Sequence, residues 1–473
     1  MLRPHFWLLA LVAGFAVEAL RGQTSAAPTS GLLVGQAWAG NPVNFAFLTQ
    51  GDHQFVAYYD AERKITVAAR RLGSTGWTTV HPEGRYLEKA KRDSNVTGWD
   101  SHNYLALVLD HDGFLHLSGN MHVDALVYYR SSRPFDISSL ERLDRMTGER
   151  ETSCTYPVFF QNTAGDLFYR YRDGGSGNGS DLYNAFDPAT HTWRRLVDTA
   201  LLDGEKKRNA YALDPTPGPD GRFHLVWMWR NTPDCSTNNT LSYARSRDLI
   251  HWEDHLGRPI TLPVTLARGD VIDAAQPREG LINMTFALGF DAQKLPVVVY
   301  HRYDAAGHSQ LFAARPDGDG WRTRALTDWT FKWAFSGGGS ISGDVLLAAP
   351  QLTGDGLMIV PYQTAALGAG RVRFRAADLT PQSVLPSPAA GAGVSWASGA
   401  AAALTALQAP HNAGMEVSLK LSHQNGICYV LRWETMPRNR DQPRAQIPPP
   451  TELRVFEIPD PANELVLPAA VGS

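Results

Sequence analysis

The feature that most constrains the fold is a unit of about 45 to 50 residues that recurs from residue 43 to the end of the chain. Each unit holds short alternating or apolar runs separated by Asp-Gly turns, such as Asp112-Gly113 and Asp220-Gly221. Almost no segment has helical periodicity. Because a repeat of this size with about four strands per unit is typical of a β-propeller, the sequence predicts an all-β, seven-bladed β-propeller.

The first and last units fit the same architecture. A propeller closes its ring when an early strand pairs with the last blade, which removes exposed sheet edges. The candidate closing strand is Leu32-Leu-Val-Gly-Gln-Ala-Trp38. No linker is strong enough to split the chain, so we expect a single domain over residues 28–473, and we expect it to be a monomer.

The N-terminus has the composition of a signal peptide. Arg3 and His5 precede an apolar run over residues 6–17, and small polar residues follow at 22–30. The apolar run is short for a membrane span. We therefore expect residues 1–27 to be removed and the rest to be secreted or periplasmic, with no membrane partner.

Charge and composition narrow the classes of partner. The net charge is −3 and no long basic run occurs, which argues against a nucleic-acid partner. Net charge does not describe a single cleft, so a local basic pocket for an acidic substrate remains compatible with it. Aromatic residues reach 10%, which suits β-sheets and also surfaces on which sugar rings stack.

Two polar motifs carry candidate catalytic histidines. His102 lies in Trp99-Asp-Ser-His-Asn-Tyr104, and His122 follows 20 residues later in Ser118-Gly-Asn-Met-His-Val-Asp124. The motifs flank a predicted hairpin, and matching strand ends of such a hairpin can face the same side of a blade. We therefore expect both imidazoles at one mouth of the central channel.

The next unit adds Tyr156 and, 16 residues later, Arg172. A cation beside a uronate carboxylate stabilises the enolate-like state that forms when the C5 proton leaves. A neutral histidine or a tyrosinate can take that proton, and a tyrosine or histidine can protonate the departing glycosidic oxygen. These four residues therefore suit β-elimination, whereas the paired carboxylates of ordinary glycosidases are hard to find.

Other polar residues are assigned to binding or to structure. The expected substrate-binding residues are Asn103, Asn120, Arg170, Tyr211 and Arg302. Arg170 alternates with tyrosines along the strand, so its side chain shares a face with Arg172, and that face could also be solvent. His116 and His224 lie in apolar strands and are expected to be structural.

Metal and disulfide assignments stay open. Catalysis requires no cofactor in this interpretation, but a structural zinc or calcium ion is compatible with the sequence. The weak candidate ligands are Cys235, His251, His301 and His308, which lack the spacing of a zinc site. The three cysteines, Cys154, Cys235 and Cys428, allow one disulfide and one free thiol.

Several motifs resemble the BNR-4 type of BNR-repeat propellers. They are residues 44–60, 99–104, 116–122, 128–137 and 235–248. Within that family the chain resembles ulvan lyases of polysaccharide lyase families 24 and 25, which have seven-bladed propellers. The resemblance implies an acidic polysaccharide substrate, cut between sulfated rhamnose and glucuronate or iduronate. It also implies that His102 and His122 are catalytic, that Tyr156 is the acid and can also serve as the base, and that Arg172 neutralises the carboxylate.

Two alternatives remain. The same scaffold hosts family 145 exo-α-L-rhamnosidases, in which a histidine in the early strand region is critical; Gln50 occupies that place here, although His53 is close. A non-catalytic glycan-binding propeller is the other alternative. Asn239 and Thr240 stand where the family is expected to have a histidine that can bind a structural metal, which weakens the expectation of a metal.

Overall fold

Short strands paired into antiparallel sheets make up the regular structure. A computed structural model describes residues 31–386, 403–404 and 406–459. Within these ranges the strands form seven sheets of four to six strands, and a two-stranded sheet of β6 (Tyr86–Leu87) and β7 (Arg92–Asp93). The prediction of an all-β chain is confirmed. The predicted signal peptide, residues 1–27, lies outside the described residues.

The first three larger sheets take up the N-terminal part of the chain. Sheet 1 contains β2 (Ala46–Gln50), β3 (His53–Tyr59), β4 (Ile65–Arg71) and β5 (Thr78–Val80); sheet 2 contains β8 (Leu105–Leu109), β9 (Leu115–Gly119), β10 (Tyr128–Ser131) and β11 (Leu140–Leu143); sheet 3 contains β12 (Cys154–Gln161), β13 (Leu167–Asp173), β14 (Ser180–Asp187), β15 (Thr192–Arg195) and β16 (Leu202–Asp203). A short 3-10 helix, Ile137–Ser139, precedes β11.

The next three sheets follow in chain order. Sheet 4 contains β17 (Asn209–Ala212), β18 (Thr216–Pro217), β19 (Phe223–Arg230), β20 (Asn238–Ser246), β21 (Trp252–Glu253) and β22 (Asp270–Asp273); sheet 5 contains β23 (Phe286–Phe290), β24 (Pro296–Tyr303), β25 (Ser309–Asp317) and β26 (Gly320–Ala325); sheet 6 contains β27 (Val345–Leu347), β28 (Gln351–Leu352), β29 (Leu357–Thr364), β30 (Gly368–Arg375) and β31 (Thr380–Pro386). A second 3-10 helix, Cys235–Thr237, precedes β20.

Sheet 7 joins the two ends of the chain. It contains β32 (Glu416–Gln424), β33 (Ile427–Thr435), β34 (Thr451–Pro459) and, from the N-terminal side, β1 (Leu32–Ala37). Strand β1 runs antiparallel to β34, with Leu32 opposite Val455 and Gln36 opposite Glu452. The predicted closing strand is therefore confirmed.

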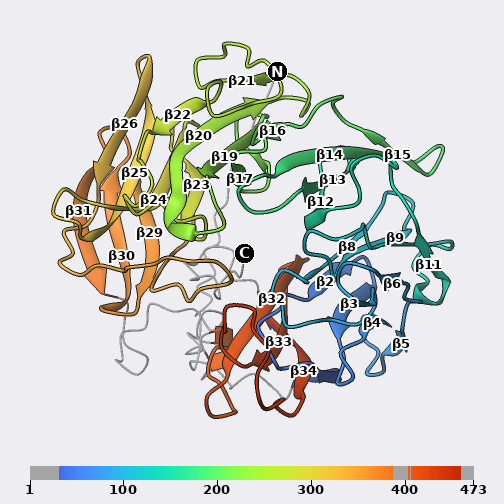
Figure 1. Cartoon of the computed structure of the whole chain (residues 1–473). Helices are drawn as coiled ribbons and strands as arrows, with labels where there is room; N and C mark the ends of the chain where they lie inside the picture. The colour runs from blue at the N-terminus through green and yellow to red at the C-terminus, as the bar shows by residue number, and fades with distance from the viewer. Residues whose placement is uncertain (1–30, 387–402, 405, 460–473) are drawn as a thin grey trace, which may run out of the picture.

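Apolar side chains fill the spaces between neighbouring sheets. Trp227 of sheet 4 clusters with Phe168 of sheet 3, and Val299 of sheet 5 clusters with Val360 of sheet 6. In Figure 1 the sheets follow one another around the centre of the molecule, from the blue strands through green and yellow to red. In this arrangement a functional site can be formed by the loops at the strand ends.

Six turns between strands share one pattern of side-chain-to-backbone hydrogen bonds. A carboxylate or amide oxygen of Asp60, Asp110, Asn162, Asp254, Asp291 or Asp304 accepts hydrogen bonds from the backbone N–H groups two and four residues later. Asp and Asn favour turns because their short side chains can bond to the nearby backbone in this way. These turns account for the Asp and Asn residues that separate the strands in the sequence.

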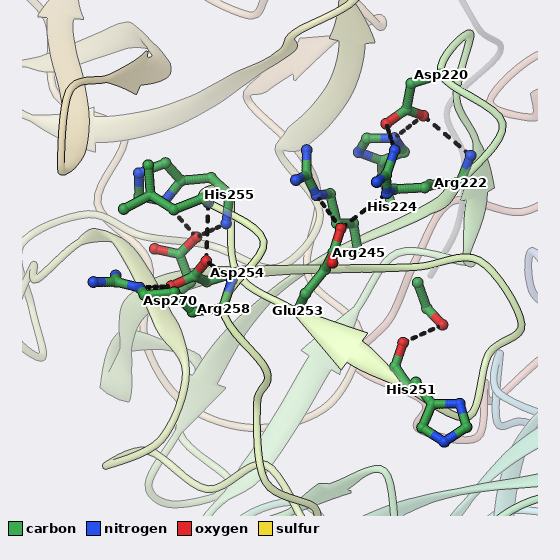
Figure 2. A network of polar contacts seen from close by, with 12 residues as sticks. Asp220, Arg222, His224, Arg245, His251, Glu253, Asp254, His255, Arg258 and Asp270 are labelled. Atoms are coloured by element: carbon green, nitrogen blue, oxygen red, sulfur yellow. Dashed lines mark hydrogen bonds and ion pairs between the residues drawn. The ribbon is translucent and has the colours of Figure 1, made fainter.

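His116 and His224 belong to matching networks in sheets 2 and 4. His224 bonds through Nδ1 to the hydroxyl of Tyr243 at 2.6 Å and through Nε2 to Asp220 at 2.9 Å. His116 makes the same pair of bonds, to Tyr128 and to Asp110. Figure 2 shows His224 and Asp220 beside the arginines of the same region. Because both ring nitrogens are satisfied inside the sheet, these histidines are structural, as expected from their apolar strands.

Candidate active site

A pocket with about 720 Å³ of empty space lies where loops of sheets 2, 3 and 4 meet the β26–β27 and β33–β34 connections. Its lining includes His102, His122, Tyr156 and Arg172, so the structure brings the four predicted catalytic residues together. His102 precedes β8, His122 follows β9, and Tyr156 and Arg172 lie on β12 and β13.

One carboxylate holds both histidines. The two oxygens of Asp100 lie 2.6 Å from Nδ1 of His102 and 2.5 Å from Nδ1 of His122. The imidazole rings stack with centroids 4.2 Å apart. Because Asp100 accepts from both Nδ1 atoms, each Nε2 is left to accept or donate a proton at the pocket.

The shared carboxylate also sets the charge of the pair. Burial raises the pKa of Asp100, but hydrogen bonds from the two histidines and their charge outweigh that effect and hold it well below its usual range. Burial lowers the pKa of His122, and the neighbouring His102 lowers it further, against the opposing effect of Asp100. His122 is therefore neutral at neutral pH and able to accept a proton.

Strained backbone places His122. Asn120 and Val123, on either side of it, adopt positive φ angles of 58° and 55°. A left-handed conformation is a clear outlier for a β-branched residue such as valine. The N–H of Val123 donates to Oγ1 of Thr155 at 2.7 Å, and this bond joins the segment that carries His122 to sheet 3. Strain of this kind persists where the surroundings enforce it, and it clusters at functional sites.

A β-bulge turns Tyr156 into the pocket. The register between β12 and β13 shifts between Thr155 and Val158, and Tyr156 has a φ of 60°. Its ring lies 5.5 Å from that of His102. Burial raises the pKa of Tyr156, the neighbouring Tyr211 raises it further, and Arg172 offsets only part of this. Tyr156 therefore keeps its proton and is suited to donate it.

Arg172 carries a buried charge that is not neutralised. Its side chain is 1% exposed, its Nε donates to the carbonyl of Gly174 at 3.0 Å, and its Nη2 donates to Thr155 at 3.2 Å. Its buried Nη1 has no hydrogen-bond partner, and among the described residues no carboxylate forms an ion pair with it. Because an unpaired buried charge is unfavourable, this geometry is typical of a site that binds an anion.

Tyr211 and Arg230 form a second pair beside the first. The guanidinium carbon of Arg230 lies 4.2 Å from the centre of the Tyr211 ring, and its Nη1 donates to the tyrosine oxygen at 3.2 Å. Burial raises the pKa of Tyr211, but the charges of Arg230 and Arg172 outweigh it and lower the pKa below its ordinary value. The pKa of Tyr156 is therefore raised, whereas the pKa of Tyr211 is lowered.

The lining of the pocket is basic. It includes three arginines, Arg172, Arg230 and Arg438, together with the two histidines. None of the described residues that line it is an Asp or a Glu. A pocket with this charge selects anionic ligands, and it lacks the carboxylate pair on which most glycosidases depend.

Of the five predicted substrate-binding residues, Tyr211 alone lines the pocket within the described structure. The side chain of Asn120 instead donates to the carbonyls of Ser94 and Val96. Asn103, next to His102, is buried, and its main-chain carbonyl accepts from the hydroxyl of Tyr59. Neither asparagine lines the pocket, so their predicted role in substrate binding gains no support from the structure.

The two predicted arginines outside the pocket already have partners. Arg170 forms ion pairs with Asp181 and Asp214, and Arg302 pairs with Asp273 at 2.8 Å. Arg170 does share a strand face with Arg172, as expected, but it lies two residues further from the strand end. Both guanidinium groups are therefore taken up by carboxylates, and neither residue lines the site.

The weak metal candidates do not assemble. His251 bonds to Asp248 on an exposed turn and lies apart from His224 and His255 in Figure 2. His301 is buried, its Nδ1 donates to the Gly280 carbonyl, and burial lowers its pKa to about 4. His308 lies at a turn near Asp304, and Cys235 lines the pocket.

No group of three or more close potential metal ligands in the described part of the chain contains any of these four residues. The amide of Asn239, where the family histidine was expected, bonds to Asn231 and Thr237. The donor set therefore does not fit a structural zinc or calcium site at these positions. The group that does meet the distance criterion is Asp100, His102 and His122, whose Nδ1 and carboxylate atoms are already joined by hydrogen bonds.

The three cysteines are buried, and no disulfide joins any two of them. The disulfide that the cysteine count allowed does not form. No helix in the described part of the chain is long and apolar enough to cross a membrane.

Sequence reasoning missed three charged residues of the site. They are Asp100, Arg230 and Arg438. Asp100 lies two residues before His102 in the motif that was singled out, and an acidic residue so close to a candidate catalytic histidine is a usable signal. Arg230 ends a buried strand, and Arg438 lies in a long loop, so neither had a local signal.

Comparisons with known proteins place this chain in a family. The sequence model described as "BNR repeat-containing family member" matches residues 53–329. An ulvan lyase, long isoform, from Pseudoalteromonas sp. (strain PLSV) is 28% identical over 132 residues, which are 26% of this chain and 13% of that protein. The corresponding enzyme of Alteromonas sp. (strain LOR) is 27% identical over the same length, with the same coverage. The match therefore spans a small part of these relatives.

Solved structures share the fold over most of the chain. Polysaccharide lyase Uly1 superposes with a TM-score of 0.57 at 14% identity, covering 91% of this chain and 99% of its own. A PL25 ulvan lyase bound to -[GlcA(1-4)Rha3S]- gives a TM-score of 0.55 at 12% identity, covering 90% and 95%. The resemblance noted from the sequence motifs is confirmed.

Proposed function

The chain belongs to the BNR repeat-containing family, and we propose that it is a polysaccharide lyase that cleaves uronate-containing glycans by β-elimination. The observation that carries the proposal is the buried, unpaired guanidinium of Arg172 beside Tyr156 and the paired histidines. A cation fixed in this way binds the uronate carboxylate and stabilises the charge that develops as the C5 proton leaves.

Each step has a group suited to it. Neutral His122 takes the C5 proton through Nε2, while Asp100 holds the Nδ1 protons of both histidines and so fixes their tautomers. Electrons from the C5–H bond form the C4–C5 double bond as the C4–O4 bond breaks. Tyr156, whose pKa is raised by burial, donates its proton to O4. The products are an unsaturated uronate end and a free sugar end, and no water is added.

The proposal extends to the whole protein. We assign the seven larger sheets to the blades of one seven-bladed propeller over residues 28–473, preceded by a signal peptide at 1–27, in a secreted or periplasmic monomer. The substrate is an acidic, ulvan-like glycan of rhamnose and glucuronate or iduronate. The shared fold and the local similarity to ulvan lyases support this reading.

The rhamnosidase alternative is less well supported. His53, the histidine that kept it open, stacks on Phe135 and pairs with Asp52. Neither His53 nor Gln50 lines the pocket. The basic lining, without a carboxylate among its described residues, further favours elimination over hydrolysis.

Incubation with ulvan and other uronate polysaccharides tests the proposal. The expected result is a rise in ultraviolet absorbance from the conjugated uronate, lost in Arg172→Ala, Tyr156→Phe and His122→Ala proteins that keep their unfolding midpoint. Release of rhamnose without that absorbance would support the glycosidase, and binding without turnover would support a lectin-like module.

A further inference from the structure

The β33–β34 loop (residues 436–450) brings a carboxylate from sheet 7 to the segment that carries His102. Asp441 in this loop accepts hydrogen bonds from the Ser101 N–H at 3.0 Å and from the Ser101 hydroxyl at 2.8 Å. Its other oxygen accepts from the Ser340 N–H at 2.8 Å. Asp441 therefore joins three segments that are far apart in the sequence, although it is not one of the residues that line the pocket.

Residues 100–103 form a turn, the histidine turn, with Ser101 inside it. The N–H at the end of this turn donates to the carbonyl at its start. Oδ1 of Asp100 accepts from the N–H of His102 at 2.9 Å and lies 2.6 Å from Nδ1 of the same residue. Oδ2 of Asp100 lies 2.5 Å from Nδ1 of His122, which belongs to a different segment. The position of the histidine turn therefore decides whether one carboxylate can reach both rings.

Bonds inside the histidine turn fix its shape but not its place relative to the rest of the pocket. The N–H and the hydroxyl of Ser101 are directed out of the turn to Asp441, and the hydroxyl also bonds to the hydroxyl of Ser340. Oδ2 of Asp441 lies 3.8 Å from Nδ1 of His102. In the described part of the chain no lysine or arginine forms an ion pair with Asp441. Its carboxylate is therefore committed to the histidine turn and to the β26–β27 connection.

Strained backbone holds Asp441 in this place. Arg440 and Asp441 adopt positive φ angles of 50° and 61°, and Arg440 donates to the carbonyls of Ser336 and Gly338. Gly339 has a φ of 73°, and a Cβ added to it would lie 2.7 Å from the carbonyl oxygen of Arg440. Strain of this kind persists only where the surroundings enforce it. The loop and the β26–β27 connection therefore fit closely at the point where Asp441 meets the histidine turn.

We infer that Asp441 is a positioning residue for the paired histidines. By holding the histidine turn through Ser101, it places the Asp100 carboxylate where it meets Nδ1 of both rings. Because that carboxylate fixes the tautomer of His122, loss of Asp441 should disturb the proposed base without removing any group that lines the pocket. The kinetic consequence rests on the proposed function, whereas the geometry of the histidine pair does not.

Nuclear magnetic resonance of protein labelled with 15N-histidine tests the positioning without a substrate. The Nδ1 protons of His102 and His122, in bonds of 2.6 and 2.5 Å, should give downfield signals that exchange slowly with water. His102→Gln and His122→Gln proteins assign the two signals. In Asp441→Ala we expect the His122 signal to shift or broaden, although no group bonded to His122 has been removed. Asp441→Asn, which keeps an oxygen for the two donors of Ser101, should retain the signal.

Elimination kinetics with ulvan give a second readout. Asp441→Ala should lower kcat about 10- to 100-fold, because a misplacement of about 1 Å in a reacting group has an effect of this size. KM should change less than about 2-fold, since the pocket lining is intact. Asp441→Asn should recover most of the lost kcat. In an Asp100→Asn background, Asp441→Ala should lower kcat less than about 2-fold further, because the two residues act through one path.

Arg444→Gln is the matched control in the same loop. Arg444 donates to the carbonyls of Gly40 and Pro437, so its loss loosens the loop without touching the histidine turn. We expect this variant to leave both the His122 signal and kcat unchanged. A change equal to that of Asp441→Ala would assign the effect to the loop as a whole and overturn the inference.

Ser101→Ala approaches the same contact from the other side, and it serves if Asp441→Ala does not keep the unfolding midpoint of the wild type. It removes one of the two bonds between Ser101 and Asp441, so we expect a smaller change of the His122 signal and a loss in kcat of about 3- to 10-fold. An unchanged Ser101→Ala protein would assign Asp441 to folding alone.

Three further results would overturn the inference. They are an unaltered His122 signal in Asp441→Ala, an additive loss in the Asp100→Asn background, and an Asp441→Asn protein as impaired as Asp441→Ala, which would assign the effect to charge. A changed signal in a protein whose wild type eliminates no uronate polysaccharide would contradict the lyase and leave the positioning role standing. Wild-type elimination, with the signal and kcat unaltered in Asp441→Ala, would do the reverse.

Discussion

Arg170 and Arg172 occupy the same face of β13, two residues apart, yet they have opposite electrostatic surroundings. Arg170 is neutralised by Asp181 and Asp214, whereas Arg172 is buried and unpaired. A protein retains an unpaired buried charge at a functional site and supports it with stability from elsewhere. The two residues therefore provide a matched comparison between a binding role and a structural role.

Replacing Arg172 by glutamine should affect activity and not stability, whereas replacing Arg170 should affect stability. Arg172→Gln should lower kcat/KM for elimination about 100- to 1,000-fold, because the carboxylate loses its cation, without lowering the free energy of unfolding. Arg170→Gln should destabilise the fold by about 3 to 5 kcal/mol, because Asp181 is left buried and unpaired. Urea unfolding and initial rates measure both. A destabilised Arg172→Gln protein would indicate a structural role instead.

The histidine pair makes a prediction about pH. His122 must be neutral to act as base, so kcat/KM should fall as pH drops through its pKa, which lies below the ordinary value of about 6.5. Asp100→Asn removes the anion that favours the charged imidazole, so the acid limb should move to lower pH. The plateau should also fall roughly 100-fold or more because the tautomers are no longer fixed. An acid limb of the pH profile that stays in place or moves to higher pH in Asp100→Asn would contradict the assignment of His122 as the base.

At this scale the sequence predicted the members of the site better than their surroundings. His102, His122, Tyr156 and Arg172 could be named because their spacing matches a known family. Asn103 and Asn120 lie outside the pocket lining, because a polar residue next to a candidate catalytic one can equally point into the fold, and only the conformation distinguishes the two. The roles of all four catalytic candidates remain predictions until they are tested by substitution.

Hairpins are the elements that place these residues. Asp110 heads the β8–β9 hairpin, which separates the two histidine motifs, and it accepts from Asp112, Phe114 and His116. Such turns could be predicted because Asp-Gly pairs separate many of the apolar runs. The bulge at Tyr156 was not readable, since one extra residue in a strand leaves no compositional mark, although it is what turns that side chain into the pocket.

Removing the turn carboxylate should loosen the hairpin. Asp110→Ala leaves two backbone N–H groups and the buried His116 without their acceptor, so we expect a loss of about 2 to 3 kcal/mol of unfolding free energy. Asp112→Ala, an exposed position in the same turn, should change it by less than about 0.5 kcal/mol. Denaturant unfolding of the two variants measures the difference, and equal effects would show that Asp110 does not support the turn.

At the scale of the whole molecule, the ring depends on joining the two chain ends. Strand β1 covers the edge of β34, and this pairing was foreseen because a propeller must remove its open edge. The all-β class was foreseen for the same kind of reason, from the repeat. The loop that brings Arg438 to the pocket was not foreseen, because contacts between residues 101, 340 and 441 depend on how distant sheets are placed.

Truncation tests the closure. A chain that begins at residue 38 lacks β1, so it should unfold at lower temperature and aggregate through the exposed edge of β34. A chain that begins at residue 31 keeps β1 and should match the wild type. Scanning calorimetry with light scattering compares the two, and an unchanged transition without β1 would contradict the closing role of that strand.

The central claim, that the pocket eliminates rather than hydrolyses, is tested most directly by mass spectrometry of the products formed from ulvan oligosaccharides. Elimination predicts uronate-ended products lighter by one water molecule than the hydrolysis products, each carrying a C4–C5 double bond, and their absence with Arg172→Gln. Saturated uronate ends at the mass of hydrolysis products would contradict the account.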